Sequence, residues 1–598
     1  MSSDDMLRWD LDSLFPGGSA SKEYAEFLNR IREKLDSAGQ LLDKIKNQND
    51  LLHFGEWRTF VLSLQDLYDH IRHAGAFAGC LTSQNVNDEL GHSHEATVSQ
   101  FGARWQVLMT GFEEFAIAVG DQQWQEFVAQ DGLKEIKFYL DDLRDRARAK
   151  MAPEMEKLAI NLAVDGYHAW NRLYDKMAGD LRVDFEENGR TDRISLGQLS
   201  SKLESPDRKI RETAFMKLQE AWESRAELAA MALNSQAGFR LALYQNRGWQ
   251  SHLYEPLRIA RLKEETLAAM WSAVAKSIER FKPYIIAKKK ILGIDSFKWF
   301  DQTAPVGKLN KSYSYPEACS FIVEHLSSFS EEMGAFSRMA LDKRWVESEY
   351  RPGKAAGGFC TSFPLKKESR IFMTFSGTFG GLSTLAHELG HAYHSFVLKD
   401  KPSFASRYPM TLAETASTFN ELRVTDAALE SSDDHEEKLM LLDQKIANGF
   451  TMLCNIRARF IFDDTFYTER KKGFVPRSRL NQIMLEAQKQ AYGDLIEGDG
   501  WHPLFWASKL HFFITAMPFY NFPYTFGFLF ANGVYDRALK EGKSFAKRYR
   551  ALLEDTGSMT NEEIAEKHLG ENLTHEDFWE DSIDRVLADI EPFVKMAG

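Results

Sequence analysis

The segment 387–391, with the sequence His-Glu-Leu-Gly-His, constrains this chain more than any other feature. His387 and His391 are four residues apart, so on an α-helix both imidazoles project from one face and can reach the same metal ion. Glu388 lies beside them and can take a proton from a metal-bound water. The motif therefore predicts a metal-binding helix, provided that the surrounding sequence is helical.

The residues around this motif have the pattern of an amphipathic helix. On a wheel that advances about 100° per residue, His391 and His394 lie within about 40° of His387. The opposite face carries apolar side chains, namely Leu385, Leu389, Ala392 and Phe396. Ser383 is expected to cap the start of this helix, just after the Gly380-Gly381 pair.

Composition excludes several classes of protein. The formal net charge is −13 and no basic block offsets it, which argues against nucleic-acid binding. The four cysteines are far apart and show no C-x-x-C spacing, so they are expected to be reduced thiols. The acidic start has neither the basic nor the apolar region of a secretory signal, so we expect a cytoplasmic protein.

Residues 510–535 carry no charged side chain, and a stretch of that length raises the question of a membrane span. Pro518, Asn521 and Pro523 lie near its middle, and no basic flank follows it. We therefore expect a buried aromatic wall and no membrane association.

Most of the chain has helical periodicity. The expected helical segments are 22–48, 55–80, 95–130, 152–178, 205–245, 263–292, 315–341, 411–430, 437–470, 477–492 and 540–555.

Two regions have the pattern of strands. Alternation in residues 181–185, a turn at Asn188-Gly189 and residues 194–196 predict a β-hairpin. We place a domain boundary there, between an N-terminal helical domain of residues 1–195 and a second domain of residues 196–598. Short strands are also expected at 359–363 and 370–375, directly before the metal-binding helix.

A catalytic zinc takes three protein ligands and one open position, so the third ligand must come from another element. Glu414 is the candidate, because it lies on the polar side of an amphipathic segment whose apolar side carries Leu412, Ala416 and Phe419. Thr411-x-x-Glu414 is also a capping box, which needs no metal, but the upstream motif favours the ligand. Glu421 returns to the face of Glu414 and could orient a ligand imidazole; a plain surface glutamate is the alternative.

His394 is the rival third ligand. It lies about 10.5 Å along the helix axis from His387, which is too far for one tetrahedral ion to bind both together with His391. We expect His394 to support the site indirectly or to be structural.

Three separated blocks resemble one known family. Residues 357–362, 384–391 and 414–421 look like the M3 zinc metallopeptidases, in particular the oligoendopeptidase F branch, which is kin to thimet oligopeptidase and neurolysin. The similarity covers nearly the whole chain. It implies a mainly α, two-lobed fold with a small β element beside the active-site helix and a deep central channel.

The resemblance also assigns roles at the site. It implies one zinc ion per chain, held by His387, His391 and Glu414, with Glu388 as the base and proton shuttle. As part of the mechanism, we expect the strand of residues 359–362 to pair by its edge with the peptide backbone, with Gly358, Phe359, Cys360 and Thr361 as the substrate-binding residues.

The family carries a late His/Tyr segment that contributes transition-state groups, and His511, Tyr520 and Tyr524 are its counterparts here. The two tyrosines keep the family's spacing, whereas His511 precedes Tyr520 by more residues than in the thimet-like members. A later tyrosine of those members is Phe528 here, which puts its role in doubt. Aromatic core packing is the alternative reading for Tyr520 and Tyr524.

The sequence therefore predicts a zinc-dependent endopeptidase that acts on short oligopeptides. Two alternatives stay open: a carboxypeptidase or dipeptidyl carboxypeptidase on the same scaffold, and an inactive peptide-binding protein. An oligomer is compatible with the sequence but is not indicated by it.

Overall fold

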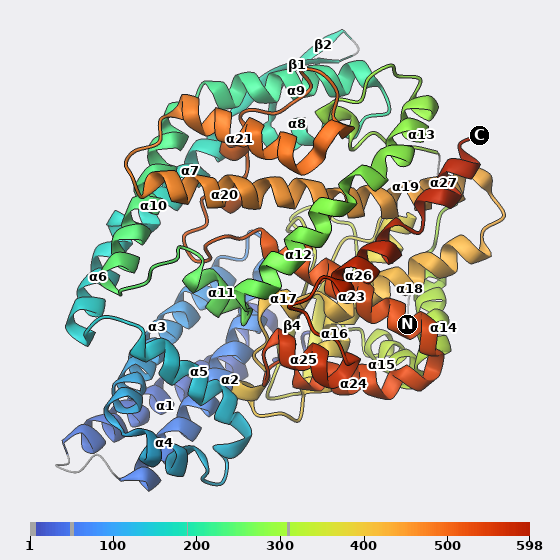
Figure 1. Cartoon of the computed structure of the whole chain (residues 1–598). Coiled ribbons are helices and arrows are strands. Elements are labelled where there is room, and N and C mark those ends of the chain that lie inside the picture. Colours follow the sequence, from blue (N-terminus) through green and yellow to red (C-terminus); the bar gives the residue numbers. More distant parts are fainter. Residues whose placement is uncertain (1–6, 48–52, 188, 308–310) are drawn as a thin grey trace. The chain divides into compact units, whose positions relative to one another are not determined.

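The protein is built mainly of α-helices (Figure 1), as the resemblance predicts. The computed structural model describes residues 7–47, 53–187, 189–307 and 311–598, and 72% of the chain is helical. Among the described residues, no helix is long and apolar enough to cross a membrane.

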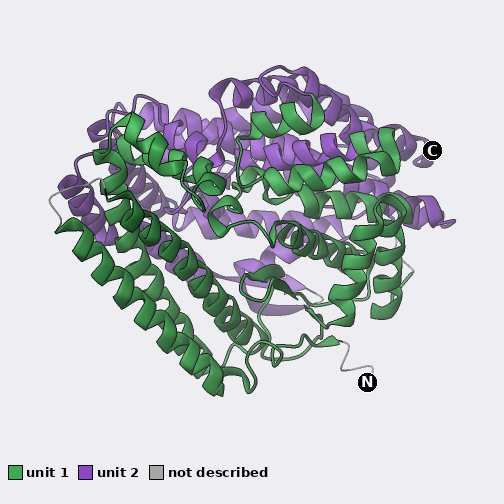
Figure 2. Cartoon of the chain, turned by 90° about the horizontal axis from the view of Figure 1, so that it is seen from below, with its two compact units in different colours: residues 1–150, 311–428, 537–570 green, residues 151–310, 429–536, 571–598 purple. Residues whose placement is uncertain are grey.

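The chain forms two compact units, and each is assembled from three separate segments (Figure 2). The first unit contains residues 1–150, 311–428 and 537–570, and the second contains residues 151–310, 429–536 and 571–598. The predicted domain boundary at residue 195 falls inside a continuous segment of the second unit. A separate domain of residues 1–195 therefore stays a prediction and does not coincide with either unit.

The first unit begins with packed helices, whose bounds are α1 (Lys22–Lys46), α2 (Phe54–Gln84), α3 (Glu89–Ala118), α4 (Asp121–Val128) and α5 (Lys137–Arg148). Aromatic side chains at helical spacing fill their core, and Trp57 stacks on Phe115 with ring centroids 4.1 Å apart. The single helix expected over 95–130 is wrong, because α3 ends at Ala118 and α4 begins after Gly120.

The middle segment of the first unit holds a small sheet between helices. Its elements are α14 (Tyr315–Phe329), α15 (Glu331–Asp342), β3 (Val346–Glu347), β4 (Phe359–Phe363), β5 (Glu368–Phe372) and α16 (Phe379–Leu398). The strand order is β3-β5-β4, with β4 antiparallel and β3 parallel to β5. In the described sheet β4 pairs with β5 alone, so its other edge is open.

Helix α16 begins earlier than expected. Thr378 caps it, because its Oγ1 accepts a hydrogen bond from the Gly381 amide at 3.2 Å. The prediction that Ser383 caps this helix is wrong, because Gly380 and Gly381 lie inside its first turn.

The first unit is completed by α17 (Met410–Ala413), most of α18 (Thr415–Ser431), α24 (Ala546–Asp555) and α25 (Asn561–Leu569). Helix α18 continues past residue 428 into the second unit, and α23 (Phe522–Glu541) likewise contributes to both.

The second unit is also helical. Its remaining elements are α6 (Pro153–Gly166), α7 (His168–Asp180), β1 (Arg182–Glu187), β2 (Arg190–Ser195), α8 (Leu196–Lys202), α9 (Arg208–Glu223), α10 (Ala226–Asn246), α11 (Tyr254–Ala260), α12 (Glu264–Ser277), α13 (Lys282–Leu292), α19 (His435–Phe450), α20 (Ile456–Arg470), α21 (Arg477–Tyr492), α22 (Phe505–Ser508), α26 (Asp577–Leu587) and α27 (Ile590–Met596). Strands β1 and β2 form the predicted antiparallel hairpin, although Asn188 of its turn lies outside the described residues.

Candidate metal centre

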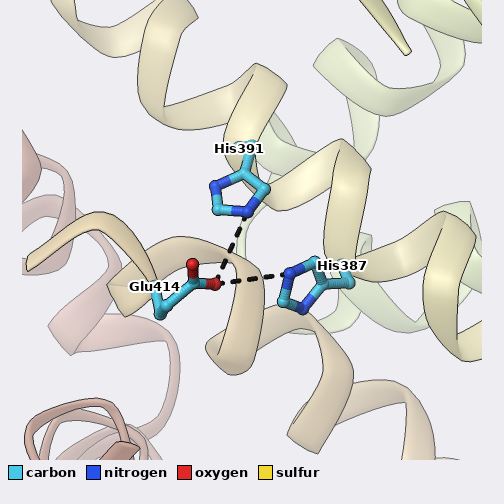
Figure 3. Close-up of side chains that lie close together, drawn as sticks. All are labelled: His387, His391 and Glu414. Carbon is cyan, nitrogen blue, oxygen red and sulfur yellow. Dashed lines mark ion pairs between the residues drawn. The ribbon is translucent and has the colours of Figure 1, made fainter. Parts of the chain in front are cut away.

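His387, His391 and Glu414 lie together, with their side chains pointing toward one another (Figure 3). The two histidines come from α16, and Glu414 lies at the junction between α17 and α18. One potential ligand atom from each residue lies within 4.8 Å of the others. The Oε2 atom of Glu414 is 3.3 Å from Nε2 of His387 and 3.5 Å from Nε2 of His391.

These distances fit a tetrahedral zinc ion. Ligand atoms about 2.1 Å from a tetrahedral ion are about 3.4 Å apart, and both measured nitrogen–oxygen distances are close to that value. The donor set of two imidazoles and one carboxylate, with a fourth position left for water or substrate, is also typical of catalytic zinc sites.

A close helix crossing brings the carboxylate to the histidines. A Cβ atom on Gly390 would lie 2.5 Å from both the carbonyl oxygen of Ala416 and the Cα of Ser417, so glycine permits this approach. The amide of Asn420 strengthens the crossing, since its Nδ2 donates to the Ala386 carbonyl at 3.1 Å.

Glu414 interrupts the helix that was expected to run from 411 to 430. It ends α17, and α18 begins at the next residue. The capping-box alternative is wrong, because Pro409 precedes the first turn and Thr411 lies inside α17, where its hydroxyl donates to Asn561 Oδ1 at 3.2 Å. Instead, Glu414 accepts a hydrogen bond from Ser417 Oγ at 2.8 Å, which fixes the carboxylate near the histidines.

Glu421 holds the other side of the His387 ring. Nδ1 of His387 donates to Glu421 Oε2 at 3.3 Å, which leaves Nε2 directed at Glu414. Burial favours the neutral ring, but the hydrogen bonds and negative charges of Glu414 and Glu421 outweigh it and raise the pKa of His387 to about 10. The site therefore has a strongly negative potential that a cation would neutralise.

Burial acts in opposite directions on the pKa values of the other two proposed ligands, His391 and Glu414. Burial lowers the pKa of His391 to about 4, so its ring is neutral and has a lone pair available for a metal. Burial acts to raise the pKa of Glu414, but the hydrogen bond from His387 and the attraction of the imidazoles outweigh it and lower that pKa to about 2.

Glu388 is buried beside this group, with only 6% of its surface exposed. Its Oε2 atom has no hydrogen-bond partner among the described residues, and burial raises the pKa of its carboxyl to about 7. A Cβ on Gly358 would lie 3.5 Å from Oε1 of Glu388, so β4 begins directly over this carboxyl. An acceptor without a partner and with a pKa near 7 suits a general base.

His394 faces the interior of the first unit. It is fully buried, stacks on Tyr408 with ring centroids 4.2 Å apart, and its Nε2 lies 2.9 Å from Thr556 Oγ1. These contacts support the structural alternative for His394.

A cleft of about 1080 Å³ in the first unit contains the metal group. Its walls include the predicted substrate-binding residues Gly358, Phe359, Cys360 and Thr361, together with His387, Glu388, His391 and Glu414. Sequence reasoning missed Arg72 of α2, which also lines the cleft and donates to Ser362 Oγ at 2.8 Å. No local pattern marks Arg72, because α2 is distant in sequence from the motif.

Comparison with known proteins identifies the family. A family model described as "Peptidase family M3" matches residues 201–584, which is more than half of the chain. This chain belongs to peptidase family M3. A second model, described as "Oligopeptidase F", matches residues 117–182.

Two relatives match this M3 chain over 94% of its length. Oligoendopeptidase F (plasmid) of Lactococcus lactis subsp. cremoris is 23% identical over 94% of this chain and 92% of its own length. Oligopeptidase PepF of Bacillus subtilis is 22% identical over 94% of this chain and 82% of its own length. The predicted M3 metallopeptidase of the oligoendopeptidase F branch, a metalloendopeptidase, is therefore confirmed.

Solved structures share the fold of this M3 chain. Oligoendopeptidase-F from Enterococcus faecium has a TM-score of 0.71 at 18% identity, covering 96% of this chain and 99% of that chain. A solved chain from Chlamydophila abortus has a TM-score of 0.85 at 19% identity, covering 99% and 98% respectively.

The late segment of this M3 chain lies in the second unit, whereas the metal group lies in the first. His511, Tyr520 and Tyr524 form one aromatic group, with ring centroids 5.6 Å apart for His511–Tyr520, 5.9 Å for His511–Tyr524 and 5.3 Å for the two tyrosines. All three are partly exposed, unlike the buried Phe528. Their part in the reaction stays a prediction.

Proposed function

We propose that this chain hydrolyses internal peptide bonds of short oligopeptides with one zinc ion held by His387, His391 and Glu414. The observation that carries the proposal is the spacing of their ligand atoms, 3.3 and 3.5 Å between the carboxylate oxygen and the two imidazole nitrogens. When bound, zinc would act as a Lewis acid and lower the pKa of water from about 15.7 to near 7.

Glu388 is the proposed general base. Its unpartnered Oε2 accepts a proton from the attacking water, and the same carboxyl then delivers that proton to the leaving amine nitrogen. Burial keeps solvent water away from this carboxyl, so the proton stays available for the amine. Glu421 fixes the His387 ring through Nδ1, which keeps Nε2 free to bind the metal.

The open edge of β4 is the proposed binding site for the peptide backbone. Main-chain hydrogen bonds from residues 358–361 would hold an extended peptide beside Glu388 and would tolerate varied side chains. His511, Tyr520 and Tyr524 are proposed to donate hydrogen bonds to the developing oxyanion, where loss of one donor typically costs about 2.7–4 kcal/mol. A cytoplasmic location remains a prediction from the sequence.

The test combines metal content with product mapping. The purified chain should contain about one zinc per chain, and a Glu388→Gln variant should retain zinc but cleave no peptide. A peptide blocked at both ends should still be cut internally, whereas a carboxypeptidase or dipeptidyl carboxypeptidase would need a free carboxyl end. Full turnover by Glu388→Gln would refute the role of this residue, and inactivity of the zinc-loaded wild type would favour the peptide-binding alternative.

A further inference from the structure

Two positive side chains of the second unit lie against the same aromatic ring. Arg459, on α20, has its Cζ 5.3 Å from the ring centroid of Phe505, and Lys509 has its Nζ 5.1 Å from that centroid. Arg459 is only 8% exposed, and Lys509 is partly buried. Two cations within about 5 Å of one ring are held close enough to repel each other in a medium of low dielectric constant.

Neither cation forms an ion pair with an acidic side chain of the described residues. Asp463, four residues after Arg459, interacts with it electrostatically, but the Asp463 carboxylate accepts its hydrogen bond from Asn521 Nδ2. Within the described ranges, no carboxylate lies within 4.0 Å of Arg459 or Lys509. The Nε of Arg459 donates to Asn455 Oδ1 at 2.9 Å, but its two terminal amino groups and the Lys509 ammonium donate to none of the described residues. The guanidinium therefore retains the two parallel donors that bind a carboxylate in a bidentate manner.

The other buried cations of the second unit have acceptors for their terminal nitrogens. Arg240 donates to the hydroxyls of Tyr167 and Tyr467 and to the Thr515 carbonyl, and two further cations pair with carboxylates. Arg211 lies 2.9 Å from Asp301, and the Nζ of Lys288 lies 3.0 Å from Asp443. Burying a charge without a partner is costly, so buried cations in proteins are normally paired in this way. The contrast indicates that the described part of the chain does not supply the acceptor that Arg459 and Lys509 lack.

The positive pair acts directly on the late aromatic group. Burial together with the charges of Arg459 and Lys509 lowers the pKa of His511 to about 4. The Nδ1 atom of His511 is buried and has no hydrogen-bond partner among the described residues. His511 also stacks against Tyr520, so the positive pair and the proposed oxyanion donors belong to one neighbourhood of the second unit.

We propose that Arg459 and Lys509 form a subsite for a carboxylate of the peptide substrate. The proposal rests on the proposed peptidase function, because the anionic group that an unmodified peptide offers is a carboxylate, at its C-terminus or on an Asp or Glu side chain. The two terminal amino groups of Arg459 hold the carboxylate in a fork, and the Lys509 ammonium adds a third donor. The subsite makes a peptide with a carboxylate at the matching distance a better substrate than its neutral analogue.

The test compares matched peptides on the full-length protein. One pair differs only in a free or amidated C-terminus, and a second series replaces each Glu by Gln in turn. The wild type is expected to cleave one carboxylate peptide with kcat/KM about tenfold or more above its neutral partner, as for a charge-assisted hydrogen bond. The free-terminus pair and the Glu/Gln series distinguish the two sources of the carboxylate.

Lys509→Met retains the apolar stem over Phe505 and removes the charge. It is expected to reduce the carboxylate preference, which is the ratio of kcat/KM for the acid peptide to kcat/KM for its neutral partner, at least severalfold. Arg459→Met should abolish the preference, and thermal unfolding checks that each variant is folded. Lys289→Met is the matched control, because it removes a charge from the same unit but from a lysine that lies 2.7 Å from Glu497.

Equal kcat/KM for every peptide pair in the wild type, or an unchanged preference in Lys509→Met, overturns the subsite while leaving the peptidase function intact. If no peptide is cleaved, the peptidase function fails by itself. Calorimetric titration of the wild type with the acid and amide forms of the same peptide then decides the subsite separately, since equal affinities overturn it and tighter binding of the acid supports it.

Discussion

Replacing Gly390 by alanine should separate the two elements that carry the proposed ligands. The new Cβ would lie 2.5 Å from the carbonyl oxygen of Ala416 and from the Cα of Ser417. Ordinary carbon contacts begin near 3.4 Å, so the elements must part by about 0.9 Å. Both opposing atoms belong to the backbone, so no rotamer change can relieve the contact.

The displacement acts directly on the metal group, because Glu414 lies only two residues before Ala416. A shift of about 0.9 Å would increase the 3.3 Å distance between Glu414 and His387 toward about 4.2 Å, whereas bound ligands tolerate deviations of about 0.2 Å. Overpacking of this kind typically costs about 1–3 kcal/mol of folding free energy. We expect zinc affinity to fall by about 10–100-fold, the range found when groups that orient ligands are lost.

The assay is competition for zinc against a fluorescent chelator, with thermal unfolding of the metal-free protein measured in parallel. Gly380→Ala is the matched control on the same helix, because its Cβ would meet only Thr378 Oγ1, at 3.6 Å. That variant should bind zinc like the wild type and be equally or slightly more stable, by about 0.5–1 kcal/mol. Wild-type zinc affinity in Gly390→Ala would refute the reasoning.

Two further predictions concern the same site. Glu421→Gln removes the negative charge from the partner of His387 Nδ1 and should weaken zinc binding by about 10–100-fold, while activity returns at saturating zinc. Unchanged zinc affinity would show that the 3.3 Å contact does not orient the ring. Burial raises the pKa of Glu388 to about 7, and a base acts only when deprotonated, so kcat/KM should fall as the pH drops through or below 7. A bound cation acts in the opposite direction and lowers the pKa of Glu388. A pH–rate profile whose acid limb has its midpoint well above 7 would therefore contradict the assignment.

The sequence predicted the parts of the structure that local patterns encode. Helical periodicity located most helices, and the 387–391 motif with Glu414 predicted three side chains that the structure brings together. This worked because one helical face carries both histidines and because the second element has its own polar stripe. The roles of the late histidine and tyrosines came from similarity to the family, because helical periodicity carries no information about them.

The failures share a physical cause. The sequence placed the start of α16 at Ser383 and a continuous helix through Glu414, because local patterns do not show tertiary contacts. Gly390 was not singled out, because the need for glycine arises only when α18 packs against it. Arg72 reaches the cleft only through the fold of the first unit.

The segment 537–570 has a consequence for how the protein is made. Tyr549 of α24 stacks on Phe419 of α18 with ring centroids 4.4 Å apart, and Thr556, directly after α24, contacts His394 of α16. A segment that bears no proposed ligand therefore supports both α16 and the helix that follows Glu414. The ribosome synthesises this support more than a hundred residues after the last ligand. A nascent or prematurely terminated chain therefore has every proposed zinc ligand but lacks their support, so stable loading with metal should wait until synthesis is nearly complete.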